Sequence, residues 1–184
     1  MRYSAAEKQK GKKGMERIIY SKCSDDRKEA YAVRTELVLR EDDLLVRRSA
    51  WKDQGVPHVR HIYEGLEKWE KSCKGKTFRF PSCTAQNASV EIEYIEGDTV
   101  EEKLNQFLEA GEKEKILSAV RKIFEEIETD FDTTAFSVTE EFEEVFGKAP
   151  LPDGLKACSV TGMELLFQNL VAAEDDRMTI SDAE

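Results

Sequence analysis

The sequence predicts an α+β fold, in which a five-stranded antiparallel sheet with one helix precedes a mainly helical region. Two observations carry this prediction. Runs rich in β-branched and aromatic residues, separated by charged turns, fill residues 16–50 and return at 77–80 and 89–95. From residue 97 onward, apolar residues recur at the spacing of amphipathic helices. At 184 residues, of which 40% are hydrophobic, the chain is long enough for one sizeable core or two small lobes.

The first lobe is expected to span residues 15–96. Residues 1–14 are polar and basic, with nothing to bury, and predict a disordered tail. The five strands of the sheet are expected at residues 17–20, 31–39, 44–50, 77–80 and 89–95. Between the third and fourth strands, one helical face is formed by Val59, Ile62, Tyr63, Leu66 and Trp69.

The second lobe, residues 97–184, is expected to be mainly helical. Two capping-box sequences, Thr99-Val-Glu-Glu102 and Ser137-Val-Thr-Glu140, each predict the start of a helix. Between them a longer helix is expected, with an apolar face that runs from Ile116 to Phe131. Near the end, two β-favouring runs joined by an acidic turn predict a hairpin of residues 170–173 with 178–180.

The charge distribution and the cysteine pattern indicate which partners and which compartment are expected. The formal net charge is −10, with 15 Lys and Arg against 10 Asp and Glu in residues 1–60 and 13 against 28 afterwards. This acidic bulk disfavours a nucleic-acid partner. No apolar stretch approaches the roughly 20 residues of a membrane span. The polar N-terminal residues do not have the pattern of a signal peptide, and the four cysteines form no CxxC motif, which predicts reduced thiols and a cytoplasmic location.

The spacing of three polar residues near the end indicates a phosphotransferase metal site. Glu164 stands five residues before Asn169, which stands thirteen before Asp182, and the predicted hairpin lies between the last two. In kinase-like enzymes an acidic residue receives the substrate proton, while an Asn and an Asp in this order hold Mg²⁺ through oxygen atoms. The alternative is that Asn169 is a capping residue and Asp182 a turn residue on either side of a hairpin.

With these elements placed, the chain resembles divergent protein-kinase-like domains of the aminoglycoside-phosphotransferase and lipopolysaccharide-kinase type. Such domains occur in bacterial proteins that also carry glycosyltransferase or methyltransferase modules for surface polysaccharides. The resemblance runs from about Tyr20 to Glu184 and rests on the motifs Leu45-Val-Arg-Arg-Ser49, Glu91-Ile-Glu-Tyr-Ile-Glu-Gly97, Val160 to Asn169 and Thr179 to Asp182. An unrelated α+β domain with accidental spacings is the other interpretation.

The resemblance implies roles for residues of the first lobe. Arg48 takes the position of the lysine that contacts the α and β phosphates of ATP, and Glu67 that of the helix glutamate that pairs with this base. Glu93 and Ile95 fall in a hinge-like segment whose backbone would contact adenine. The alternatives are an exposed strand arginine for Arg48, a solvated helix charge for Glu67 and a plain strand end for the hinge.

Several departures from the family pattern argue against standard catalysis. Residues 21–30, which would cover the phosphates, contain no glycine, although close backbone approach to phosphate favours glycine. Glu164 replaces the usual catalytic Asp, and Gly162-Met163 stand where a His is expected. The resemblance implies Mg-ATP as the cofactor. These departures favour a non-catalytic scaffold for polysaccharide biosynthesis, while the retained Asn169 and Asp182 favour the alternative, an active Mg-ATP phosphotransferase that acts on an alcohol group.

The resemblance also implies a chain cut short after its metal-binding Asp. A complete kinase continues with helices that cover the face represented here by residues 116–131. Uncovered, that face would form an apolar patch, and such patches mark partner surfaces. The expected partners are a glycosyltransferase or methyltransferase module, further polypeptide, or a second copy in a homodimer.

Overall fold

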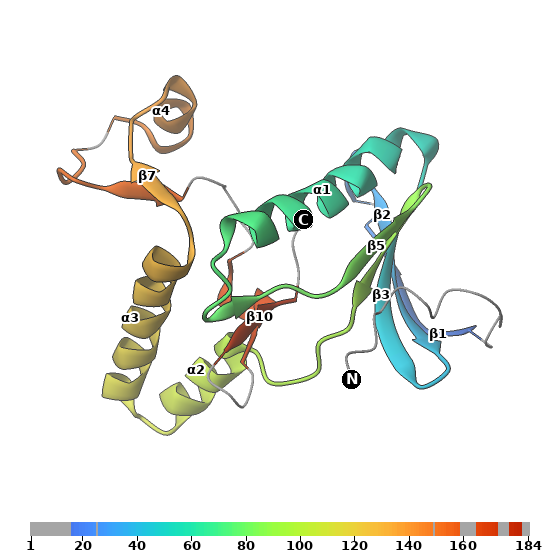
Figure 1. The fold of residues 1–184 in the computed structure, drawn as a ribbon, viewed down its shortest axis with the longest axis horizontal. Helices are drawn as coiled ribbons and strands as arrows, with labels where there is room; N and C mark the ends of the chain where they lie inside the picture. The colour runs from blue at the N-terminus through green and yellow to red at the C-terminus, as the bar shows by residue number, and fades with distance from the viewer. Residues whose placement is uncertain (1–15, 25, 149, 159–164, 173–176, 182–184) are drawn as a thin grey trace, which may run out of the picture. The chain divides into compact units, whose positions relative to one another are not determined.

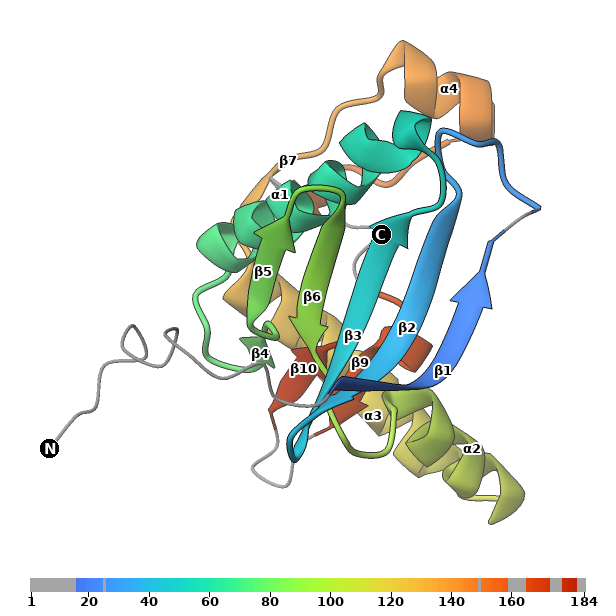
Figure 2. The same cartoon turned by 90° about the vertical axis from the view of Figure 1, so that its right-hand side faces the viewer.

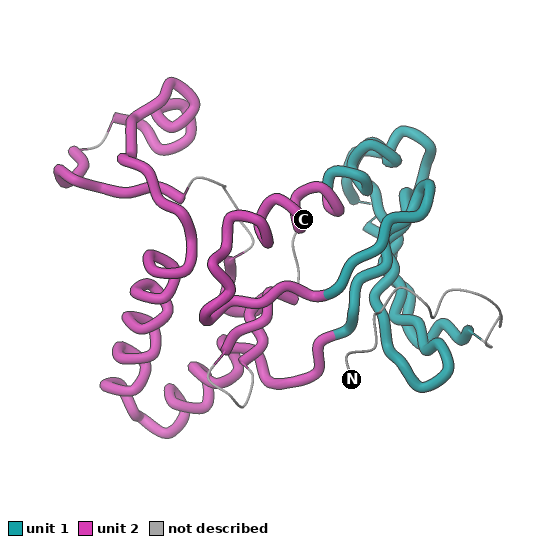
Figure 3. Tube along the Cα trace, viewed as in Figure 1, with its two compact units in different colours: residues 1–61, 82–94 teal, residues 62–81, 95–184 magenta. Residues whose placement is uncertain are grey.

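The computed structural model describes residues 16–24, 26–148, 150–158, 165–172 and 177–181. The chain divides into two compact units (Figure 3). Unit 1 comprises Met1–His61 and Ser82–Tyr94, and unit 2 comprises Ile62–Pro81 and Ile95–Glu184. Residues 62–81 group with the second unit, whose longer part begins at Ile95. None of the helices in the described part combines the length and apolar character needed to cross a membrane.

Unit 1 contains the five-stranded antiparallel sheet that the sequence predicts. Its strands lie in the order β1-β2-β3-β6-β5 (Figure 2). Their bounds are β1 Glu16–Cys23, β2 Val33–Arg40, β3 Asp43–Ala50, β5 Cys83–Gln86 and β6 Ser89–Glu93. β3 is the central strand and pairs with β2 on one side and with β6 on the other, whereas β1 and β5 form the two edges of the sheet.

Two-residue turns fix the register of two hairpins in this sheet. Arg40 pairs with Asp43 and Gln86 pairs with Ser89, so that only two residues connect the strands in each case. The first turn residues, Glu41 and Asn87, have φ of 58° and 46°. Such left-handed backbone is what the tightest hairpin turns require, and Asn adopts it more readily than most residues.

The fifth strand of the sheet differs from the sequence prediction. Residues 77–80 were expected to provide a strand of this sheet, but Cys83–Gln86 takes that place as β5. The short strand β4, Phe78–Arg79, instead pairs in parallel with β10, Met178–Ile180, which pairs antiparallel with β9, Leu170–Ala172. A short apolar run indicates a strand but carries no signal for a partner 100 positions away in the sequence.

The first helix confirms the predicted apolar face. Helix α1, Val56–Ser72, follows a short 3-10 turn, η2, at Asp53–Gly55. Four members of the predicted face are buried: Val59, Ile62, Leu66 and Trp69. The recurrence of these side chains at three- and four-residue intervals places them along one side of the helix.

Among the described residues, unit 2 contains three further helices and several short strands. Their bounds are α2 Val100–Glu109, α3 Lys113–Asp130, β7 Thr133–Ala135, α4 Glu140–Phe146, β8 Lys156–Cys158 and the 3-10 turn η3 Phe167–Asn169. Figure 1 shows α2 and α3 joined by a tight connection, in which Gly111 has φ of 71°. Strands β7 and β8 pair with each other and were not anticipated from the sequence.

The two predicted capping boxes have different outcomes. Thr99 accepts a hydrogen bond from the backbone N–H of Glu102 at 3.1 Å, and Glu102 accepts one from the backbone N–H of Thr99 at 2.8 Å. That box is confirmed. The second prediction is wrong in its position, because Thr139 rather than Ser137 is the N-cap of α4 and accepts from the N–H of Phe142. Both residues carry a hydroxyl, and helix boundaries read from sequence shift easily by two residues.

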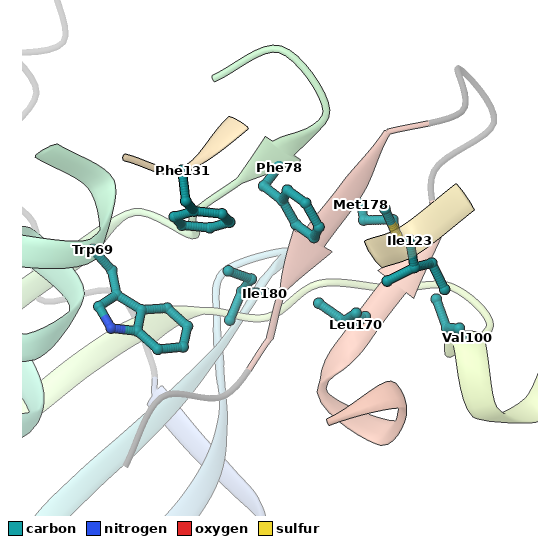
Figure 4. Close-up of a cluster of buried hydrophobic side chains, with 8 residues drawn as sticks. All are labelled: Trp69, Phe78, Val100, Ile123, Phe131, Leu170, Met178 and Ile180. Atoms are coloured by element: carbon teal, nitrogen blue, oxygen red, sulfur yellow. The ribbon is translucent and has the colours of Figure 1, made fainter. Parts of the chain in front are cut away.

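The core of unit 2 joins elements that are far apart in the sequence (Figure 4). Its buried members are Trp69, Phe78, Val100, Ile123, Phe131, Leu170, Met178 and Ile180. Burial of a side chain of this size contributes roughly 1.5–3 kcal/mol. The face of α3 that the sequence singled out is therefore only partly uncovered, since Ile123 and Phe131 are buried while Leu117 and Phe124 are exposed.

Candidate functional site

Arg48 is buried in the middle strand of the five-stranded sheet. It lies opposite Thr35 on β2 and Val90 on β6, and only 8% of its surface is exposed. The alternative interpretation as an exposed strand arginine is therefore wrong. A buried guanidinium must be compensated by polar groups, and Arg48 does interact with other groups of the chain.

Glu67 has partners within its own helix. Tyr63 Oη donates a hydrogen bond to Glu67 Oε1 at 2.9 Å, and Lys71 Nζ lies 3.5 Å from Glu67 Oε2. Both partners stand four residues away on α1, a spacing at which side chains on one helix face meet. This carboxylate is partly exposed. Arg48 belongs to unit 1 and Glu67 to unit 2.

The hinge-like segment begins inside the sheet. The backbone N–H of Glu93 donates to Ser82 O at 2.9 Å, and that of Tyr94 donates to Leu44 O at 3.3 Å. The carboxylate of Glu93 accepts hydrogen bonds from the backbone N–H and the hydroxyl of Ser82. These two backbone donors are thus engaged in strand pairing. Ile95 follows β6, is half-buried and belongs to unit 2.

After the hinge-like segment, the backbone passes close to β9. Gly97 has φ of 144°, and a Cβ atom at this position would lie 2.9 Å from Val171 Cγ1. Thr99 forms an isolated bridge with Val171, and the N–H of Ala172 donates to Asp98 O at 3.1 Å. Glycine is required here for both its backbone conformation and its lack of a side chain.

Asn169, which the sequence predicts to be a metal ligand, immediately precedes strand β9 of the β9–β10 hairpin. It is the last residue of η3 and is buried. Its carbonyl oxygen accepts hydrogen bonds from the backbone N–H of Ser181 at 2.8 Å and from Ser181 Oγ at 3.1 Å. Ser181 immediately precedes Asp182 in the sequence. One predicted ligand is therefore in direct contact with the residue before the other.

Two predicted site residues, Glu164 and Asp182, lie outside the described residues. The structure therefore gives no geometry for the predicted catalytic base, Glu164, or for Asp182, one of the two predicted metal ligands. Within the described residues, no three His, Cys, Asp or Glu side chains gather into a potential metal site. An Asn and an Asp with water would still suit Mg²⁺, which usually keeps several water ligands.

The sequence did not point to Asp130, the most fully buried carboxylate among the described residues. Its side chain accepts hydrogen bonds from the backbone N–H groups of Lys76 at 3.0 Å, Thr77 at 2.8 Å and Phe78 at 2.8 Å, and it is 0% exposed. Burial raises the pKa of Asp130, but the three backbone donors outweigh this effect and hold the pKa below its usual value. An Asp at a helix end gives no sequence signal for a loop that lies more than 50 residues earlier.

A second polar cluster lies on the sheet of unit 1. Arg40 donates to both carboxylate oxygens of Glu91, at 3.0 and 2.7 Å, and Arg47 donates to Glu91 Oε1 and to Glu16 Oε2. Burial raises the pKa of Glu91, but the two arginines together hold it below its usual value. Glu91 belongs to a motif that carries the kinase resemblance, yet its observed contacts join strands β2, β3 and β6. Strand alternation could have signalled this, since Glu91 stands between buried Val90 and Ile92.

Comparison with protein-family models, with curated proteins and with solved structures finds no match for this chain. The kinase resemblance therefore depends on the motifs and the order of elements of this chain.

Proposed function

We propose that this chain is a kinase-like domain that acts as a scaffold or interaction module rather than as a catalyst. The observation that carries the proposal is the order of its elements. A five-stranded antiparallel sheet has a helix after its third strand, helices α2 and α3 follow, and Asn169 immediately precedes a short hairpin. This is the order that the sequence resemblance implies for a small lobe, a helical lobe and a metal-binding hairpin.

The connection between β1 and β2 supports a non-catalytic role. In a kinase this connection covers the phosphates of ATP, and glycine lets the backbone approach them closely. Residues 21–30 of this chain contain no glycine and include Asp25 and Asp26. At the base of the connection, the N–H of Ser24 donates to Val33 O, and the N–H of Val33 donates to Ser24 Oγ, each at 3.0 Å. These donors are engaged within the chain and are not directed at a ligand.

Exposed apolar side chains support an interaction role. On α4, Val145 is 72% exposed and Phe146 is 69% exposed, and Leu108 and Phe124 on the α2–α3 pair are also exposed. Val145 and Phe146 are neighbours on α4, and apolar side chains exposed together are the kind of surface that marks contacts with other proteins. The resemblance suggests, as the partner, a glycosyltransferase or methyltransferase module of bacterial surface-polysaccharide synthesis. A second copy of the chain is the other partner that it suggests.

An active Mg-ATP-dependent phosphotransferase is the second candidate. The contact between Asn169 and Ser181 favours it, because this contact ties one predicted Mg²⁺ ligand to the residue beside the other. In that case Asn169 and Asp182 would hold the metal, Glu164 would receive the proton of the acceptor hydroxyl, and the metal would neutralise charge on the phosphates.

A thermal-shift titration separates the two candidates. The full chain is heated with Mg²⁺ alone and with Mg²⁺ plus millimolar ATP, beside the variants Asp182→Ala and Asp153→Ala. A ligand at about 100 times its dissociation constant adds about 2.7 kcal/mol to native stability. The scaffold proposal expects no ATP-dependent shift in any of the three proteins. A shift that Asp182→Ala abolishes and Asp153→Ala retains would overturn the scaffold proposal in favour of the phosphotransferase.

A further inference from the structure

A small apolar cavity of about 180 Å³ lies within unit 2. Helix α2 contributes Val100, Leu104 and Phe107 to its lining, α3 contributes Ile123, and β10 contributes Met178. Figure 4 shows Val100, Ile123 and Met178 close together at one end of the core cluster. Ala119 on α3 and Ala172 on β9 complete the apolar lining, which thus comes from four elements. Three of the lining residues, Val100, Ile123 and Met178, are themselves buried core residues.

The charged residues that line this cavity within the described part of the chain are all cations. They are Lys103 on α2, Lys122 on α3 and Arg177 next to β10. The chain as a whole carries a formal charge of −10, so three cations beside one apolar cavity run against its general charge. Lys122 and Arg177 each have another interaction within the chain. A bound anion would share these two cations with their existing partners.

The volume limits the apolar part of a ligand. An engineered apolar cavity of about 150 Å³ is known to hold benzene, so about 180 Å³ accommodates one six-membered ring with a small substituent or a short acyl chain. Lysine and arginine form their strongest hydrogen bonds with carboxylate and phosphate groups. We propose that this cavity binds a small amphipathic anion, in which an aryl or short acyl group fills the cavity and a carboxylate or phosphate meets Lys103, Lys122 and Arg177.

The test compares small molecules that share an apolar part and differ in charge. The full chain is labelled with ¹⁵N and titrated with 4-ethylbenzoate, 4-ethylbenzamide and 4-ethylbenzylamine, and separately with phenyl phosphate. We expect saturable shifts of amide signals in α2, α3 and β10 with at least one of the two anions. The neutral amide is expected to bind more weakly than 4-ethylbenzoate, and the cationic amine more weakly still. Which anion binds more tightly distinguishes a carboxylate ligand from a phosphate ligand.

Two variants place the binding in this cavity. Lys103→Gln should weaken binding of the anion about fivefold, the factor that corresponds to about 1 kcal/mol between unit charges 4 Å apart in water. Lys113→Gln removes the same charge from an exposed position on α3 outside the lining and should leave binding unchanged. Ala119→Leu adds three carbon atoms to the lining and should abolish binding, with circular dichroism as the check that the variant is folded.

Three results would overturn the proposal. The first is the absence of saturable binding by both anions. The second is equal binding of the anion, the amide and the amine, which would show that the cations do not select the ligand. The third is equal weakening by Lys103→Gln and Lys113→Gln, which would indicate non-specific attraction. Nothing in the proposal depends on a kinase-like function, and the titration contains no nucleotide or metal.

Discussion

The carboxylate of Asp130 accepts a hydrogen bond from the backbone N–H of Phe78 at 2.8 Å, which joins the last residue of α3 to the first residue of β4. The same carboxylate accepts from the N–H groups of Lys76 and Thr77. Phe78 also belongs to the core cluster and pairs with Met178 on β10. Asp130 therefore holds in place the segment of residues 76–78 that contributes Phe78 to the core of unit 2.

Replacement of Asp130 by Ala should strongly destabilise the protein. The change leaves three backbone donors without their acceptor, and each buried donor left unsatisfied costs about 1–3 kcal/mol. We expect the free energy of unfolding to fall by at least about 3 kcal/mol in urea denaturation, at the upper end of what single substitutions do. Asp132→Ala is the matched control, because Asp132 is exposed and its pair with Lys74 contributes at most about 1 kcal/mol. Equal losses from the two variants would contradict the assignment.

The pH dependence of stability should carry the signature of this carboxylate. The pKa of Asp130 is lower in the folded protein than the value of about 3.9 expected when unfolded. The unfolded state therefore binds a proton more readily. The stabilisation by Asp130 is complete above that value and is lost as the pH falls through the folded pKa. Between pH 7 and pH 3, the free energy of unfolding should fall more steeply in the wild type than in Asp130→Asn. Parallel curves would show that Asp130 is not the source of this pH dependence.

The arginine–glutamate cluster of unit 1 predicts unequal effects of two similar substitutions. Glu91 is 8% exposed and accepts from two arginines, whereas Glu16 is 37% exposed. Breaking a buried pair costs about 3–5 kcal/mol, and since Arg40 is partly exposed we expect about 2 kcal/mol for Glu91→Gln. Glu16→Gln should cost less than about 1 kcal/mol. Thermal unfolding of both variants measures the difference, and a larger effect at Glu16 would refute the predicted ranking.

Two glycines should respond in opposite directions to alanine. Gly97 has φ of 144°, and a Cβ there would lie 2.9 Å from Val171, so Gly97→Ala should cost about 1–3 kcal/mol. Gly65 lies within α1, where an added methyl group would meet no neighbouring side chain within 4 Å, and Gly65→Ala should add about 0.5–1 kcal/mol. Denaturant midpoints of the two variants should therefore move to opposite sides of the wild type. If Gly97→Ala left the free energy of unfolding unchanged, Val171 on β9 would have to shift away from the added methyl group without cost.

Local features of this fold could be predicted from the sequence, and pairings over long distances could not. The capping box at Thr99 and the buried face of α1 follow from spacings of three and four residues, which the sequence displays directly. Strand β5 was missed because its residues are mostly exposed and lack apolar alternation. The pairing of β4 with β10 was also missed, because it joins segments separated by the whole of α2 and α3.

The candidate site was predictable only as a set of residue types and spacings. The position of Asn169 before the hairpin agrees with that spacing, while its contact with Ser181 depends on hairpin register, which the sequence does not specify. The burial of Arg48 could not be predicted from the sequence either, since an arginine on a strand is ordinarily exposed. Catalytic use of Glu164 and metal binding by Asp182 stay predictions, because both residues lie outside the described part of the chain.

Hydrogen exchange of the full chain, with Mg²⁺ alone and with Mg²⁺ plus millimolar ATP, tests the central claim most directly. This claim is that a kinase-like order of elements exists here without nucleotide chemistry. The proposal predicts identical exchange of backbone amides in β3, in the segment from Glu93 to Gly97 and in the hairpin from Leu170 to Ile180. Slower exchange of these three segments together in ATP would show that nucleotide binds where the resemblance implies, and would contradict the non-catalytic account.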